Sequence, residues 1–210
     1  MSVSPVKLTY AVFLLFAVAL MFASGDAEAN WEQQGDYPSA ADSPIDLVYH
    51  SGSDRLIMLD ENGEDVFSYN YNTDTWAQMG DYPTGATPRI FCMVYDSESN
   101  RIILVEAGGA GNDVYSYNYG TDNWTQMGDY PSEMSRPQAM AYDSESDRII
   151  LVEDGGNGED VFSYNYNTDT WTQMEDYPSG ANPKAIAYDS ESDQIILVEI
   201  GGSGNDVYSY

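Results

Sequence analysis

The run VFSYNYNTDTW, from Val66 to Trp76, recurs letter for letter from Val161 to Trp171. Four tryptophans mark the same point of a longer pattern and follow one another at intervals of 45, 48 and 47 residues: Trp31, Trp76, Trp124 and Trp171. Self-similarity at a period of roughly 50 residues is typical of a repeat architecture. The duplicated run therefore indicates that one structural unit has been copied along the chain.

Each unit has the same internal order. A DYP loop leads to a run such as QAMAYD, a DSESD turn, a run such as RIILVE, a glycine loop, a run such as DVYSYNY, a tight turn and a last run that begins at the tryptophan. The runs are rich in β-branched and aromatic residues, the connections are rich in turn residues, and no window after the first 29 residues has helical spacing. Four short strands per unit predict an all-β protein, a β-propeller of four-stranded antiparallel blades. The predicted propeller covers residues 30–210, with units at 30–76, 77–124, 125–171 and 172–210.

The stretch AYDSESDRIILVEDGGNGEDVFSYNYNTDTWTQM, residues 141–174, resembles a kelch repeat. The glycine pair that follows the second strand is present in three units, at Gly108-Gly109, Gly155-Gly156 and Gly201-Gly202. The tyrosine of the third strand is present in all four units, at Tyr69, Tyr117, Tyr164 and Tyr210. The first unit departs from the pattern, because it reads LDENGEDV where the others carry the glycine pair. The resemblance implies a kelch-like propeller such as the central domain of galactose oxidase, whose copper site needs a set of histidines, tyrosines and a cysteine crosslink that this chain, with one histidine, cannot supply.

Two arrangements of the ring follow from the ends of the pattern. The segment NWEQQGDYP, which begins at Asn30, matches NWTQMGDYP, which begins at Asn123 at the fourth strand of a unit, and the last unit stops at Tyr210. Residues 30–36 are therefore expected to serve as the closing strand of a four-bladed ring, which removes exposed strand edges. Alternatively, the chain is the front part of a longer protein with more blades.

The first 29 residues have the layout of an export signal, with Lys7, an apolar run and small residues that end in Ala27-Glu28-Ala29. We expect cleavage after Ala29 and a secreted protein without a membrane span; an uncleaved anchor is the alternative, although the apolar run is shorter than the roughly 18 residues of a spanning helix. The single cysteine, Cys92, excludes an intramolecular disulfide and a thiolate-rich zinc site. Because it aligns with alanines in other units, Cys92 is interpreted as a small core residue.

The chain is strongly acidic, with 35 Asp and Glu against 7 Lys and Arg and a formal net charge of -28. Such a charge repels phosphate backbones and anionic lipid headgroups, so nucleic acid is excluded as a partner.

The few cations divide into two groups. Arg55, Arg101 and Arg148 recur after the first turn of their units, where they are expected to bridge to turn carboxylates. Arg89, Arg136 and Lys184 stand where a unit enters its first, innermost strand. The second group is the predicted ligand site, a ring of cations at the mouth of the central channel that could hold an anionic or sugar ligand.

The glycine loops DENGED, AGGAGND, EDGGNGED and IGGSGND contain oxygen ligands suited to calcium, but none has EF-hand spacing. The preferred interpretation is structural, with an aspartate that fixes the start of the third strand in each unit, at Asp65, Asp113, Asp160 and Asp206. No cofactor and no metal site are therefore assigned, and calcium remains an open alternative.

No catalytic residue is predicted, because His50 is the single histidine and lies in the least regular unit. The sequence favours a secreted, non-catalytic binding module that recognises a protein or an extracellular glycan through the loop face of the propeller. Two other classes remain open: a propeller that belongs to a carbohydrate-active enzyme of epimerase, lyase or oxidase type, and a structural component of the cell envelope.

Overall fold

The computed structural model describes residues 32–41, 43–60, 65–83, 90–107, 111–134, 136–154, 158–200 and 206–210. All strands belong to the unit Gly35–Tyr210. The predicted export signal, residues 1–29, lies outside the described residues. Within the described ranges no helix has the length and apolar character needed to cross a membrane.

The chain forms four antiparallel sheets, here called blades 1 to 4. Blade 1 contains β1 (Pro44–His50), β2 (Arg55–Asp60), β3 (Val66–Asn70) and β4 (Thr75–Met79). Blade 2 contains β5 (Ile90–Asp96), β6 (Arg101–Ala107), β7 (Val114–Asn118) and β8 (Asn123–Gln126). Blade 3 contains β9 (Pro137–Asp143), β10 (Arg148–Glu153), β11 (Val161–Asn165) and β12 (Thr170–Gln173). Blade 4 contains β13 (Pro183–Asp189), β14 (Gln194–Glu199) and β15 (Val207–Ser209).

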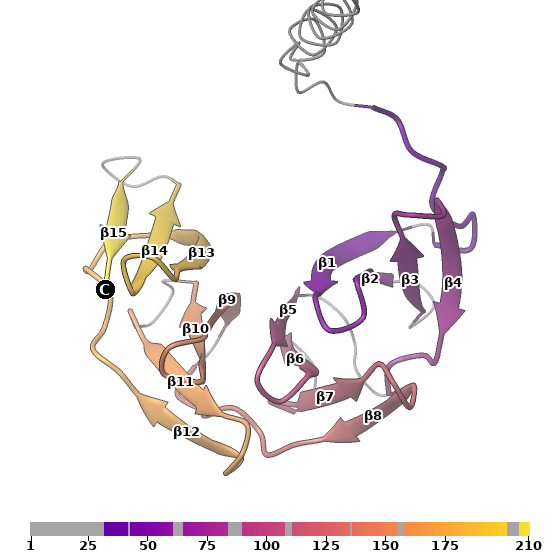
Figure 1. The fold of residues 1–210 in the computed structure, drawn as a ribbon. Coiled ribbons are helices and arrows are strands. Elements are labelled where there is room, and N and C mark those ends of the chain that lie inside the picture. Colours follow the sequence, from indigo (N-terminus) through magenta and orange to yellow (C-terminus); the bar gives the residue numbers. More distant parts are fainter. Residues whose placement is uncertain are drawn as a thin grey trace, which may run out of the picture. The chain divides into compact units, whose positions relative to one another are not determined.

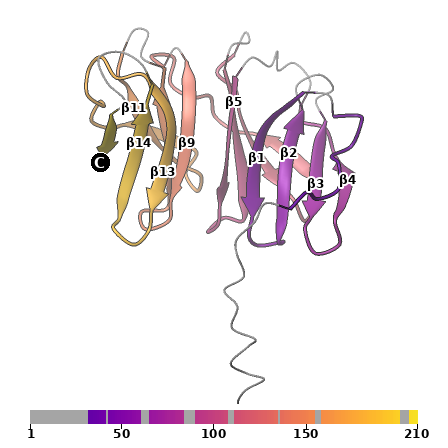
Figure 2. The same cartoon turned by 90° about the horizontal axis from the view of Figure 1, so that it is seen from above.

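The blades follow one another with their first strands innermost (Figure 1, Figure 2). β5 contacts β1 on one side and β9 on the other, and β9 in turn contacts β13. Within each blade the strands pair in sequence order. The predicted β-propeller is therefore confirmed, and within the described residues it has three four-stranded blades and a last blade of three strands.

The turn between the first two strands of a blade is held by an aspartate at its start. Asp96 accepts hydrogen bonds from the backbone N–H groups of Glu98 and Ser99, both at 3.0 Å. The turn ends on a residue with positive φ, at Asp54, Asn100, Asp147 and Asp193. Asp and Asn tolerate this left-handed conformation better than most residues, so the DSESD pattern directly encodes the turn.

The three repeated arginines close these turns in a way that the sequence did not predict. The guanidinium of Arg148 donates to the backbone carbonyls of Ser146 and Asp147, at 3.1 and 2.7 Å. Arg55 and Arg101 make the same two bonds to carbonyl oxygens. The expected pairing with turn carboxylates is wrong, because the carbonyls that precede the arginine in the turn lie closer to its side chain.

Neighbouring blades share apolar cores. Blade 2 turns one face, here called its trailing face, toward blade 1 and places Met93, Leu104 and Tyr117 in that core. Its opposite or leading face places Val105 and Val114 in the core shared with blade 3. Because successive side chains of a strand point to opposite faces, both faces of an inner blade are apolar.

A tryptophan and an aspartate lie at the interface between blades 1 and 2 and again at the interface between blades 2 and 3. In blade 2, Trp124 stacks on Tyr117 with ring centroids 4.7 Å apart, and its indole N–H donates to the carbonyl of Gly80 in the loop after blade 1. Asp122 accepts hydrogen bonds from the Tyr117 hydroxyl at 2.6 Å and from the Gly80 N–H at 2.8 Å. One carboxylate thus connects a tyrosine of its own blade to the loop that leaves the preceding blade.

Among the described strands, β1 of the first blade contacts the inner strand β5, and β13 of the last blade contacts the inner strand β9. Residues 32–36 form no strand, so the described part of the expected closing strand does not pair with β15; Asn30 and Trp31 lie outside the described residues. The Gly35 N–H instead donates to Asp74 of blade 1, as Gly80 does to Asp122 and Gly128 to Asp169. Gly35 therefore stands where the loop after a preceding blade stands at the other interfaces.

Candidate functional site

Among the strands of the repeat, the innermost ones differ most from unit to unit. They read PIDLVYH, IFCMVYD, PQAMAYD and PKAIAYD, whereas the second strands read RLIMLD, RIILVEA, RIILVE and QIILVE. The second halves of the inner strands are nearly uniform and end in the turn residue. Divergence is therefore concentrated in the first half, where the chain enters each blade.

A β-bulge displaces one residue from the ladder in three of these strands. The pairing register shifts between Pro44 and Asp46, between Pro137 and Ala139, and between Pro183 and Ala185. The extra residues are Ile45, Gln138 and Lys184. Bulges re-aim side chains and are common beside binding and active sites.

All three bulge residues line one central cavity of about 250 Å³. Every innermost strand contributes to its wall, through Ile45, Asp46, Cys92, Met93, Gln138, Ala139, Met140, Lys184, Ala185 and Ile186. The register places Asp46, Cys92, Ala139 and Ala185 at equivalent positions of the four blades. Four copies of one frame thus present four different sets of side chains to the same cavity, which makes it the candidate ligand site.

Asp46 connects two blades at this cavity. Its carboxylate accepts hydrogen bonds from the Leu47 N–H at 2.7 Å and from the Met93 N–H of β5 at 2.9 Å. Burial raises the pKa of Asp46, although both hydrogen bonds act in the opposite direction. Cys92, Ala139 and Ala185 carry no carboxylate at this position, so within the described residues this carboxylate bond joins blades 1 and 2 only.

Cys92 is buried and free, in agreement with its interpretation as a small core residue. Burial raises the pKa of its thiol to about 12, and the negative charge of Asp46 acts in the same direction. Because the thiolate is the reactive form, we expect thiol reagents at pH 8 to modify native Cys92 about a thousandfold more slowly than the unfolded chain. Labelling with and without urea measures this ratio at a single thiol, and rapid modification of the native protein would contradict the buried position.

Of the three predicted ligand-binding cations, the structure describes Lys184 and Arg136, and it places them in different surroundings. Lys184 is exposed and lines the central cavity. Arg136 precedes β9 by one residue, is exposed, and pairs with Asp154 at 3.7 Å; it is absent from the lining of the cavity. Arg89 lies outside the described residues. Because the bulge residue of blade 3 is Gln138, Gln138 and not Arg136 is the structural counterpart of Lys184.

A set of buried acids was missed by the sequence analysis. Each second strand has an almost fully buried carboxylate at its last position or, in β6, one residue before it: Asp60, Glu106, Glu153 and Glu199. Asp60 accepts a hydrogen bond from the Ser43 N–H at 2.7 Å, and Glu199 accepts one from the Asn182 N–H at 3.0 Å. Asp60 and Glu199 thereby hold the backbone at the entry to the inner strand. Their signal was an acidic residue at the same position of all four units, at the end of an otherwise apolar strand.

The aspartates at the start of the third strands have structural partners. Asp65, Asp113 and Asp160 each accept a hydrogen bond from a glutamine of the fourth strand, at 2.6, 2.8 and 2.8 Å. In the described part of the chain no group of three or more His, Cys, Asp or Glu side chains is placed to hold a metal ion. Residues 61–64, 108–110, 155–157 and 201–205 of the glycine loops lie outside the described residues, so calcium binding there stays an untested alternative.

His50 replaces the turn aspartate in blade 1. Its Nδ1 accepts a hydrogen bond from the Ser53 N–H at 3.1 Å, as Asp96 does from Ser99 in blade 2. The ring is buried against Tyr95 and Tyr119, with centroids 4.3 and 5.4 Å away, and its Nε2 has no hydrogen-bond partner among the described residues. His50 is therefore placed as a turn residue within the interface between blades 1 and 2.

This position predicts a pH dependence of stability. Burial lowers the pKa of His50 below its ordinary value of 6.5, so the folded state favours the neutral ring. The contribution of the neutral ring is complete above about pH 6.5 and is lost as the pH falls through 6.5 toward the lower folded pKa. We expect wild type to lose stability relative to His50→Asp between pH 7 and pH 5, as measured by urea unfolding. Parallel pH profiles of the two proteins would contradict the prediction.

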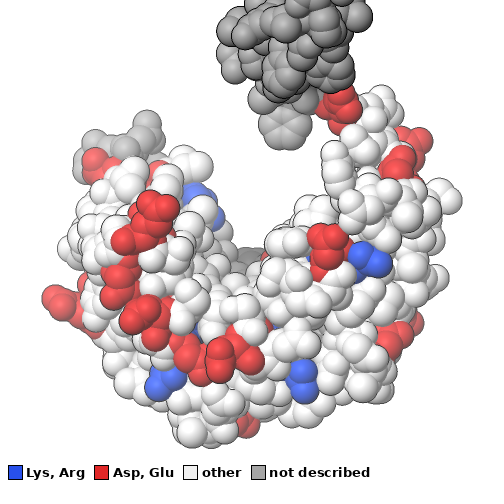
Figure 3. Space-filling model, viewed as in Figure 1, with Lys and Arg blue, Asp and Glu red and all other residues white. Residues whose placement is uncertain are grey.

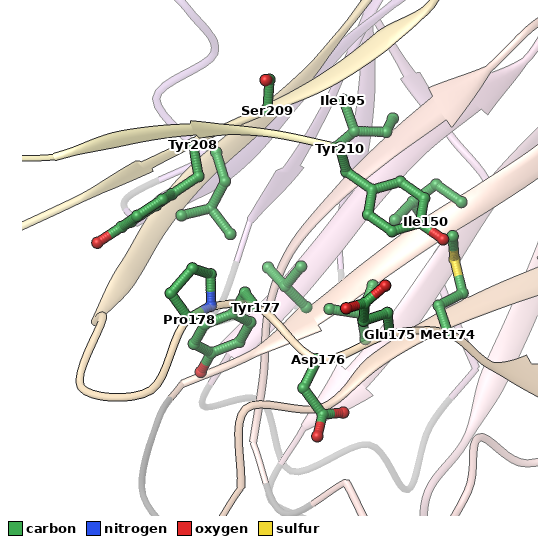
Figure 4. Close-up of a pocket in the computed structure, with 13 residues that line it drawn as sticks. Ile150, Met174, Glu175, Asp176, Tyr177, Pro178, Ile195, Tyr208, Ser209 and Tyr210 are labelled. Carbon is green, nitrogen blue, oxygen red and sulfur yellow. The ribbon is translucent and has the colours of Figure 1, made fainter.

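A second cavity, of about 310 Å³, lies between blades 3 and 4 (Figure 4). Tyr177, Tyr208 and Tyr210 border it together with Ile150 and Ile195. Tyr210 is the counterpart of Tyr117 and Tyr164, each of which is covered by a stacked tryptophan. Blade 4 has no such tryptophan in its described strands, so this cavity follows from an incomplete sheet and is a weaker candidate for a ligand site.

The surface around these cavities is acidic. Figure 3 shows Asp and Glu side chains spread across one face of the molecule, with only isolated Lys or Arg side chains between them. Arg136–Asp154 is the ion pair recorded within the described residues. Lys184 therefore places a positive charge at the central cavity of a molecule whose surface is mostly negatively charged.

Searches for relatives found no matching family model and no matching curated protein. Several solved structures share the fold. A structure of a nidogen/laminin complex has a TM-score of 0.58 and 11% identity, covering 82% of this chain and 65% of the other. A streptogramin B lyase has a TM-score of 0.58 and 11% identity, covering 85% and 57%. A catalytically inactive virginiamycin B lyase from Staphylococcus aureus, bound to quinupristin, has a TM-score of 0.56 and 15% identity, covering 83% and 57%.

The chain thus spans between 57% and 65% of the length of these structures. At such low identity the likeness shows the propeller fold alone. The kelch resemblance of the repeats has no counterpart among the family models.

Proposed function

We propose that this chain is a secreted, non-catalytic binding module with kelch-like blades, which takes a protein or an extracellular glycan at the mouth of its central cavity. One observation carries the proposal: the repeat diverges where the innermost strands enter the blades, and those residues line a shared cavity. Variation in the wall of a cavity, on a frame that is otherwise repeated, is typical of a binding site on a rigid scaffold.

Lys184 gives the site its chemistry. It is an exposed ammonium group on a bulge, at a cavity within a strongly acidic protein. Such a group favours ligands that offer carboxylate, sulfate or hydroxyl oxygens, as acidic glycans and acidic protein segments do. Asp46 on the opposite blade already accepts two backbone hydrogen bonds, which leaves Lys184 as the group most able to engage a ligand.

The test is a thermal-shift panel of neutral and acidic oligosaccharides against the protein, with two variants. Lys184→Gln introduces the residue that blade 3 carries at the equivalent bulge. Arg148→Gln is the matched control, because it removes one positive charge and introduces the residue that blade 4 carries there, Gln194, at a turn. We expect stabilisation by acidic sugars to be lost in Lys184→Gln and kept in Arg148→Gln.

Two results would count against the proposal. Equal shifts in wild type and Lys184→Gln would remove Lys184 from the site. The absence of any shift, together with no capture of an extracellular protein by the wild type alone, would instead favour the structural envelope component that the sequence left open.

A lyase-type enzyme is the other class that the similar structures suggest. The virginiamycin B lyase structure is described as an inactive histidine-to-alanine variant, which points to a histidine in that enzyme. In this chain the single histidine, His50, is buried in a turn with its Nδ1 already hydrogen-bonded. That position supports a structural role for His50 and gives the enzymatic class no support.

A further inference from the structure

We propose that Asn123 is the attachment site of an N-linked glycan, which is transferred to the chain during export. Asn123-Trp124-Thr125 is the single Asn-X-Ser/Thr triplet in the sequence, and this triplet marks an asparagine that receives a glycan when it lies on the surface of an exported protein. The modification requires passage through an export pathway, so it rests on the secreted location of the proposed function. It concerns the outer side of blade 2 and not the central cavity.

The triplet begins β8, which is the outermost strand of blade 2. Figure 1 shows β8 on the far side of the blade from its innermost strand, β5. Because successive side chains of a strand point to opposite sides, Asn123 and Thr125 share one side of β8 and Trp124 lies on the other. Asn123 and Thr125 are exposed, whereas Trp124 is half-buried. The amide and the hydroxyl that define the triplet therefore both lie at the surface.

The tryptophan in the middle of the triplet holds this orientation. Trp124 stacks on Tyr117 with ring centroids 4.7 Å apart, and its indole N–H donates to the carbonyl of Gly80 at 3.2 Å. Both contacts belong to the interface between blades 1 and 2, so β8 cannot turn its other side outward without breaking them. Tertiary packing thus keeps Asn123 exposed.

The residue equivalent to Asn123 is a threonine with a different bond in blades 1 and 3. In blade 1, Thr75 shares a hydroxyl–hydroxyl hydrogen bond of 2.8 Å with Thr73, and the equivalent bond in blade 3 is 2.7 Å long. In blade 2, the Asn123 amide donates instead to the carbonyl of Thr121 at 2.7 Å. An amide nitrogen that carries a glycan keeps one N–H, so the modified residue is able to retain this bond.

The turn before Asn123 has no side-chain bridge of the kind that the turns of blades 1 and 3 have. The Asn72 amide donates to Asp54 at 2.9 Å in blade 1, and the equivalent bond in blade 3 is 3.0 Å long. Blade 2 has Gly120 at this position, which carries no side chain. A bulky glycan beside the turn of blade 2 therefore displaces no such bridge.

The donor is an oligosaccharide carried on a lipid diphosphate. Nδ2 of Asn123 forms a bond to the anomeric carbon of the first sugar, and the bond between that carbon and the diphosphate oxygen breaks. The lipid diphosphate leaves with the electron pair of the broken bond, and one amide proton passes to solvent. The product carries a bulky, polar group beside β8, whose outer edge pairs with no strand of the described sheet, and this group hinders pairing of that edge with another chain.

Expression of the full chain in a eukaryotic secretion host tests the proposal. The chain is expressed once as it stands and once behind an export signal of the host, and the protein from medium and cell extract is analysed by mass spectrometry before and after enzymatic removal of N-glycans. Asn123→Gln and Thr125→Ala destroy the triplet, whereas Thr125→Ser keeps it. Circular dichroism verifies that each variant is folded.

The repeat supplies a matched pair of further variants. Thr170→Asn produces an Asn-Trp-Thr triplet at the equivalent place of blade 3, because Thr172 follows there. Thr75→Asn makes the same substitution in blade 1 but produces no triplet, because Ala77 follows. We expect one glycan on wild type, Thr125→Ser and Thr75→Asn, two on Thr170→Asn, and none on Asn123→Gln and Thr125→Ala.

An unmodified wild type behind the host signal overturns the proposal, and so does a glycan that remains on Asn123→Gln. A second glycan on Thr75→Asn would also overturn it, because transfer would then not follow the triplet. A chain that is secreted and modified only behind the host signal supports Asn123 as the attachment site and counts instead against the export signal of residues 1–29. The failure of the site and the failure of secretion are therefore told apart.

Discussion

Replacement of Asp122 by alanine is expected to lower the free energy of unfolding by about 3 kcal/mol or more. Its carboxylate accepts hydrogen bonds from the Tyr117 hydroxyl and from the Gly80 N–H of the loop after blade 1. Hydrogen bonds to a charged group contribute about 1.5–3 kcal/mol each, and the buried tyrosine hydroxyl would be left without its acceptor. Asp122 also has a φ of 53°, a conformation that alanine adopts less readily.

Urea unfolding followed by tryptophan fluorescence measures this loss. Asp122→Asn is the matched control, because it keeps an oxygen acceptor and tolerates positive φ, so it should lose clearly less stability than Asp122→Ala. In a double-mutant cycle with Tyr117→Phe, the two losses should be non-additive, since both variants break the same bond. A loss below about 1 kcal/mol for Asp122→Ala would show that the interblade bond contributes little.

The second large effect is expected at Leu104, in the core between blades 1 and 2. Leu104→Ala should cost about 3–4 kcal/mol, because the side chain is fully buried and a well-packed interface relaxes little around the space left behind. The equivalent substitution in the last blade, Leu197→Ala, should cost less than half of that. Leu197 lies beside the 310 Å³ cavity, in a sheet with three strands and a neighbour on one side only.

The contrast between these two leucines tests the modular character of the array. In repeat proteins each unit is stabilised by its own contacts and by its neighbours, so a terminal unit can open without the rest. Hydrogen exchange should therefore show faster exchange confined to β13–β15 in Leu197→Ala and faster exchange in blades 1 and 2 in Leu104→Ala. Equal costs and uniform exchange would indicate that the whole array unfolds as one unit.

The fold could be predicted because its signals are local and repeated. Strand runs, the DSESD turn and the tryptophan recur in register, and each has a direct structural counterpart. Asp96 and Asn100 begin and end a turn as their residue types favour, and Trp124 stacks on the tyrosine of the adjacent strand. The order of strands and turns within one unit could therefore be predicted from the residues of that unit alone.

The composition of the candidate site depends on small shifts of register, which spacing along the sequence does not reveal. Spacing alone grouped Arg136 with Lys184, but a bulge of one residue places Gln138 at the cavity in blade 3 and leaves Arg136 outside its lining. The repeated arginines were assigned to carboxylates because charge is visible in a sequence, whereas backbone carbonyls are not. The buried acids at the ends of the second strands were overlooked because an acidic residue there also resembles the start of a loop.

The amino-acid sequence by itself determined the repeat, the four antiparallel strands of a unit, their turns and the acidic surface. These properties arise from residue types and short-range spacing, which act within a few positions along the chain. Only the tertiary structure decided which side chains share the central cavity and how Asp122 bonds to Gly80. Those features depend on the packing of one blade against the next, and residues about 45 positions apart meet there only after the sheets have formed.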